Sequence, residues 1–133
     1  MEKIKLGTNH KRSVSSSIRL IEKMVWEIER EINAKDEKIL TVINRKISEA
    51  EVQYFQTLLG KIKTYIQYLA DKYDLQVSEL YLERLINSKK SSMWVILSDT
   101  ASNKLRGYGE FPKEFSMEFD KDIERLKELI SRI

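Results

Sequence analysis

Apolar residues recur along this chain at alternating intervals of three and four positions, and this spacing constrains the fold more than any other feature. The first series is formed by Val14, Ile18, Ile21, Val25, Ile28 and Ile32. The second series is formed by Val52, Phe55, Leu59, Ile62, Ile66, Leu69 and Tyr73. On an α-helix this spacing gathers the apolar side chains into one stripe. The pattern therefore predicts two long amphipathic helices.

Two further helices are expected in the C-terminal half. The first follows Ser78, a natural N-cap, and carries apolar residues as far as Leu105, just before a glycine-rich helix stop at 107–109. The pattern leaves open whether this helix continues through the polar run 87–92. The second is shorter and begins near Asp120. Its apolar face is formed by Ile123, Leu126, Ile130 and Ile133.

The boundaries between these helices are marked unevenly. Ser48 and Glu51 match a capping box, in which each side chain bonds a backbone N–H of the other residue. Residues 34–46 are expected to form a connector, and the sequence leaves open whether part of it is helical. Gly60 lies off the second stripe, so it offers room for a close helix approach at a cost of about 1 kcal/mol relative to alanine.

Apolar stripes on several helices must be covered, and a spacing near 3.5 residues favours helices packed at about 20° to one another. We therefore expect an all-α protein, an antiparallel helical bundle of three long helices plus a shorter C-terminal helix. The 133 residues suit one domain. Residues 13–133 are expected to form it, after a flexible basic leader at 1–12. The heptads also suit a coiled coil between chains, so a homo-oligomer is expected, with a dimer as the first interpretation.

The composition limits where the protein is expected to act. The chain has no cysteine, which agrees with a reducing compartment, and a cytoplasmic protein is therefore expected. No apolar run approaches the roughly 20 residues that a membrane span needs, so no membrane association is expected.

The residues that usually carry chemistry are scarce. His10 is the only histidine and lies in the basic leader, so hydrolase triads and histidine metal sites lack their parts, and we expect no metal, no cofactor and no enzyme. Six glutamates lie off the apolar stripes and are expected to be solvated: Glu27, Glu29, Glu31, Glu49, Glu51 and Glu124. Asp99 is expected to be buried and to pair with a neighbouring polar residue. The candidate polar cluster comprises Asp99, Lys104, Arg106 and Tyr108.

The remaining candidates concern binding. Exposed tryptophan and tyrosine side chains often anchor protein partners, and the candidates here are Trp26, Trp94, Tyr65 and Tyr68. The basic leader suggests phosphate or nucleic-acid contacts, for which the candidates are Lys11, Arg12, Arg45, Lys46, Lys89 and Lys90. No nucleic-acid-binding module is recognisable. The sequence therefore favours a non-enzymatic helical interaction module, with a nucleic-acid-associated regulator as the alternative.

Overall fold

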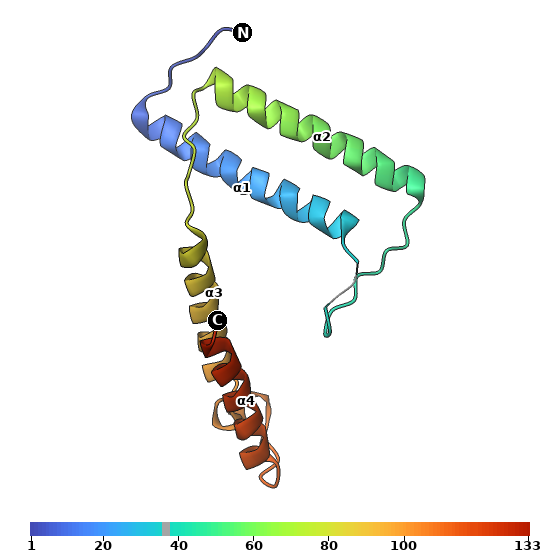
Figure 1. Cartoon of the computed structure of the whole chain (residues 1–133), viewed down its shortest axis with the longest axis vertical. Helices are drawn as coiled ribbons and strands as arrows, with labels where there is room; N and C mark the ends of the chain where they lie inside the picture. The colour runs from blue at the N-terminus through green and yellow to red at the C-terminus, as the bar shows by residue number, and fades with distance from the viewer. Residues whose placement is uncertain (36–37) are drawn as a thin grey trace. The chain divides into compact units, whose positions relative to one another are not determined.

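The computed structural model describes residues 1–35 and 38–133, and within them it contains α-helices and short 3₁₀ turns but no strand (Figure 1). The all-α prediction is confirmed. The helices are α1 (Thr8–Asn33), α2 (Glu49–Lys72), α3 (Leu82–Ser98) and α4 (Ser116–Ser131). The chain divides into two compact units, Met1–Ser78 and Glu79–Ile133, each containing two helices. The expectation of one bundle domain over residues 13–133 stays a prediction.

The start of α2 follows the expected capping chemistry. The Ser48 hydroxyl accepts a hydrogen bond from the Glu51 backbone N–H at 3.1 Å, which satisfies one of the N–H groups that a helix start leaves unpaired. The Glu51 carboxylate in turn accepts from the Ser48 hydroxyl at 3.4 Å. One half of the predicted box is therefore present, whereas the glutamate carboxylate meets the Ser48 hydroxyl instead of the Ser48 backbone N–H.

The end of α2 is a Schellman motif. Asp74 adopts the left-handed conformation with φ of 48°, and the Leu75 N–H bonds the Ala70 carbonyl at 3.0 Å. Aspartate tolerates this conformation better than most residues. The chain therefore turns at Asp74, immediately after Tyr73.

The N-terminal segment contacts the same end of α2. The Ile4 N–H bonds the Lys72 carbonyl at 2.8 Å. α1 begins at Thr8. The expected leader at 1–12 therefore includes the first turn of α1. The stretch Thr8 to Arg12 lacks proline and glycine, so nothing in it opposes a helical start.

The connector between α1 and α2 contains no helix among its described residues. Of the expected range 34–46, residues 36 and 37 lie outside the described part of the chain. Ile39, Leu40 and Val42 are almost fully exposed, at 94%, 97% and 80%.

In the second unit, α3 runs without interruption through the polar stretch 87–92. It ends at Ser98, so the expected extension to Leu105 is wrong. Beyond Ser98 the chain turns, because the Thr100 N–H bonds the Leu97 carbonyl in a tighter turn and Ala101 is extended. Two 3₁₀ turns follow, at Ser102–Lys104 and Arg106–Tyr108.

α4 begins at Ser116, four residues earlier than the apolar pattern suggested. Phe119, in its first turn, packs on Phe111 with ring centroids 4.8 Å apart. This contact holds the segment before the helix against the helix itself.

The buried core is small. Val25, Leu59 and Ile130 are the buried apolar residues of the described chain, and Ser15 is the buried polar one. The predicted α1 stripe is divided, because Val25 is buried whereas Val14, Ile21 and Ile28 are 37%, 48% and 52% exposed. Each unit is a pair of packed helices, which is consistent with a bundle. The antiparallel packing of all four helices in one bundle stays a prediction.

Candidate interaction surfaces

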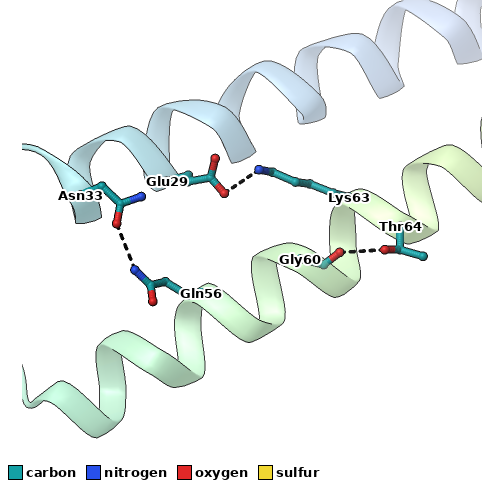
Figure 2. A network of polar contacts seen from close by, with 6 residues as sticks. All are labelled: Glu29, Asn33, Gln56, Gly60, Lys63 and Thr64. Carbon is teal, nitrogen blue, oxygen red and sulfur yellow. Dashed lines mark hydrogen bonds and ion pairs between the residues drawn. The ribbon is translucent and has the colours of Figure 1, made fainter.

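Trp26 lies at the contact between α1 and α2. Lys63 Nζ of α2 lies 4.0 Å from the centre of the Trp26 ring, within cation–π range. The same ammonium group donates to Glu29 Oε2 at 2.5 Å (Figure 2). Glu29 is therefore not the solvated residue expected from the stripe, since it pairs with Lys63 across the two helices. Trp26 remains 49% exposed.

A second polar contact joins the two helices, and a third joins α1 to the segment that follows α2. Gln56 Nε2 donates to Asn33 Oδ1 at 3.0 Å, on the side of the network nearer the connector (Figure 2). At the other end, the Gln76 N–H donates to the buried Ser15 hydroxyl at 2.9 Å. The contacts step down α1 as they step up α2, so the chain runs in opposite directions in the two helices. We call this pair the α1–α2 hairpin.

One side of the α1–α2 hairpin is apolar and uncovered. We define the α1–α2 apolar face by its side chains, which are 37–64% exposed: Val14, Leu20, Ile21, Met24, Ile28, Tyr54, Phe55, Leu58 and Tyr65. On α1 the row through Val14, Ile21 and Ile28 lies about a quarter-turn from the row that faces α2.

On α2, Leu58 and Tyr65 lie about a third of a turn from the row that faces α1, in the same rotational sense. Because the two helices run in opposite directions, rotations of the same sense bring both rows to one side of the hairpin. The two rows therefore form one surface.

Tyr65 and Tyr68 lie together on α2, with ring centroids 5.5 Å apart. They line a shallow hollow with Gly60, Thr57, Lys61 and Thr64. The Lys72 ammonium donates to the Tyr68 hydroxyl at 3.3 Å, and this contact raises the pKa of Lys72. These two tyrosines are therefore exposed neighbours, as expected of candidate anchors.

The second unit has a related arrangement. Lys127 Nζ of α4 lies 5.3 Å from the centre of the Trp94 ring of α3, and Trp94 is 39% exposed. Several large apolar side chains of this unit are also 40–71% exposed: Leu82, Leu85, Ile86, Ile96, Leu126, Leu129 and Ile133. Both predicted tryptophan anchors are thus partly covered by a lysine from the other helix of their own unit.

The candidate basic residues are distributed over both units, and several are engaged. Lys11 donates to Asp74 at 2.7 Å, and this hydrogen bond lowers the pKa of the Asp74 carboxyl group. Arg45 donates to the Glu31 carbonyl. Lys90 donates to the Ser131 and Ile133 carbonyls at 3.0 and 3.3 Å, where a cation suits the negative end of α4.

The remaining basic candidates, Arg12, Lys46 and Lys89, are exposed. Within the first unit, Arg12 and the Arg45 partner Glu31 are 19 positions apart on α1, which corresponds to about 28 Å. The basic residues of this unit therefore form two separate groups and not one patch.

The expected polar cluster is not assembled. Asp99 is exposed and follows the last residue of α3, so the expectation of a buried, paired carboxylate at this position is wrong. No hydrogen bond or ion pair joins Asp99, Lys104, Arg106 and Tyr108 in the described part of the chain. The early end of α3 explains this, because residues 99–108 leave the helix and lose its periodic spacing.

Asp120 is the carboxylate that organises this region instead. It accepts hydrogen bonds from the Ser102 N–H at 2.8 Å and from the Ser102 hydroxyl at 2.7 Å. These bonds, led by the backbone N–H, lower the pKa of Asp120. The sequence pattern does not reveal this pair, because it identifies Asp120 only as a helix start. A serine after a helix end, followed by a carboxylate on the next helix, is too weak a signal to identify it.

None of the described helices is long and apolar enough to cross a membrane. Among the described residues, no group of three or more histidine or acidic side chains is arranged to hold a metal ion. No protein-family model, curated protein or solved structure matches this chain.

Proposed function

We propose that this chain is a helical interaction module that works by associating with itself or with a protein partner through apolar helix faces. The observation that carries the proposal is the exposed area, 11,537 Å². Two separate compact domains with the masses of the two units would together expose only about 8,800 Å². The comparison does not depend on how the units are arranged.

The types of residue that contribute to the excess exposed area support the same proposal. Large apolar side chains on all four helices are 39–75% exposed, among them Met24, Tyr65, Trp94 and Met117. The α1–α2 apolar face is one contiguous surface of this kind, and large contiguous apolar surfaces are rare on monomers and typical of interaction sites. We retain cytoplasmic action as part of the proposal, on the basis of the composition.

The alternative, a nucleic-acid-associated regulator, has less support. Lys11, Arg45 and Lys90 are already engaged by oxygen atoms of this chain. A phosphate would have to displace those partners, and such binding would weaken steeply with salt.

Light scattering on a sizing column tests both functions. The protein is run over a range of concentrations at low and high salt, with absorbance recorded at 260 and 280 nm. Association that persists or strengthens at high salt, with a protein-like absorbance ratio, supports the interaction module, because apolar burial is not screened. Material absorbing at 260 nm that is lost at high salt supports the alternative.

A fluorescent apolar dye separates the remaining cases. A monomer that binds the dye has an uncovered apolar face and supports a protein partner. A monomer that does not bind it, at any concentration, contradicts the interaction module.

A further inference from the structure

We propose that the α1–α2 apolar face docks a second copy of this chain. Two α1–α2 hairpins then pack face to face in a four-helix bundle whose two-fold axis is parallel to the helices. The inference rests on the proposed function and specifies its partner.

The area of the face suits a stable dimer. Its nine side chains are about half exposed on average, and at about 200 Å² for a fully exposed large side chain they present roughly 900 Å². This is about the area that each partner buries in a complex of standard size. Val14, Ile21 and Ile28 also follow one another at intervals of seven, the repeat that keeps a helix seam aligned with a neighbouring helix.

The charges along the borders of the face determine the orientation. The outer border of the face carries Glu27 on α1 and Lys61 on α2. A two-fold axis parallel to the helices sets α1 of one copy beside α2 of the other, so an acidic border meets a basic one. An axis perpendicular to the helices would set α1 beside α1 and bring glutamates together. Complementary flanking charges select partner and orientation in helical seams.

The register follows from the contacts within one hairpin. Glu29 lies opposite Lys63 in the same copy, and rotation about an axis parallel to the helices leaves the height along them unchanged. Glu27 of one copy therefore lies level with Lys61 of the other, to within about one helical turn. Within a single copy, Glu27 and Lys61 project away from each other.

The occupancy of the face is tested by light scattering on the whole chain with one lysine substitution. Ile28→Lys places a charge in the centre of the face and is expected to weaken the dimer about a hundredfold, because each two-fold interface contains it twice. The matched control is Val95→Lys, an equally drastic change at a 62% exposed residue of α3 outside this face. It is expected to leave the dimer unchanged. Circular dichroism verifies that both variants keep their helices.

The orientation is tested by charge reversal. Glu27→Lys and Lys61→Glu are each expected to weaken the dimer about fivefold, and the double variant to regain most of the wild-type affinity. If the double variant is as weak as the singles combined, the orientation proposed here is wrong.

Two results would overturn the proposal in different ways. A dimer that survives Ile28→Lys uses another surface, and then the interaction module stands while this face is wrongly assigned. A wild-type monomer at all concentrations overturns the dimer, and the apolar dye then decides whether the interaction module also fails.

Discussion

The two units are built on the same plan, but different contacts hold them together. Each pairs two helices, buries an aliphatic residue of its second helix, Leu59 or Ile130, and covers a tryptophan of its first helix with a lysine of the second. In the first unit, polar contacts cross between the helices at two positions toward the connector, and the segment after α2 bonds Ser15 near the start of α1. In the second, the fixed points lie near the two ends of α4, where Asp120 meets Ser102 and the C-terminal carbonyls meet Lys90.

This difference shows that two helix pairs with similar apolar patterns can be held together by polar contacts at different positions. The cross-helix contacts of the first unit depend on polar residues at particular heights on both helices, such as Glu29 and Lys63. The second unit has shorter helices and fastens its ends instead. The two tryptophans, one in each unit, allow the units to be followed separately by fluorescence.

The largest effect is expected from the buried aliphatic residues. Leu59→Ala should lower the free energy of unfolding of the first unit by about 2–4 kcal/mol, and Ile130→Ala should do the same to the second, through lost burial and a cavity. Urea unfolding measures the stability of each unit separately. The first unit is followed by Trp26 fluorescence in a Trp94→Phe background, and the second by Trp94 fluorescence in a Trp26→Phe background. If either substitution shifts both transitions equally, the units unfold as one and the comparison fails.

A smaller loss is expected at the buried serine of the first unit. Ser15→Ala removes the acceptor of the Gln76 N–H and should cost about 1–2 kcal/mol, because that N–H would lack a partner inside the protein. The Trp26 transition reports it. The control is Ser13→Ala, at an exposed position of the same helix, which should change little. Equal effects at the two positions would show that the Ser15 contact is unimportant.

A stabilisation is expected at Gly60. A Cβ added there meets nothing within 4 Å, so Gly60→Ala should raise the stability of the first unit by up to about 1 kcal/mol through helix propensity. Gly60 lies on the side of α2 away from the apolar face, so the proposed dimer should persist. Destabilisation, or loss of the dimer, would indicate the close helix approach that the sequence also allows.

The smallest effect is expected at Asp120, and it depends on pH. The pKa of Asp120 is lowered in the folded protein. Its bonds to Ser102 therefore stabilise the second unit at pH values above the pKa of the unfolded chain, about 4. This stabilisation is lost as the pH falls through the lower pKa of the folded protein. Asp120→Asn should therefore reduce the acid sensitivity of the Trp94 transition and leave that of Trp26 unchanged. A variant with the same acid sensitivity as wild type would exclude this contribution.

Particular residues show how much of the fold can be predicted from the sequence. The N-cap bond of the predicted capping box, from the Glu51 N–H to the Ser48 hydroxyl, is local and is present, whereas the expected return bond to the Ser48 backbone is absent from the described residues. The end of α3 was misplaced because the apolar pattern continues to Leu105, whereas the Asp120 carboxylate draws the Ser102 backbone out of the helix. Such a contact joins residues 18 positions apart, so no local pattern reveals it.

For the candidate site residues, too, some properties follow from residue type and others only from the tertiary structure. Trp26, Trp94, Tyr65 and Tyr68 are exposed in part, as residue type alone suggests, but the lysines over both tryptophans come from another helix. Asp99 was misjudged because its burial was inferred from a helix that ends before it. Lys90 was taken for a phosphate contact, and the structure pairs it with the end of α4.

By itself, the sequence determined that this protein is helical and which faces of its long helices are apolar, because both follow from spacing along the chain. Only the tertiary structure decided which half of each apolar stripe is covered, which charges are paired and where α3 ends. These depend on contacts between residues far apart in the chain. When an apolar stripe is wider than one neighbouring helix can cover, part of the stripe stays exposed. The packing of the helices decides which part.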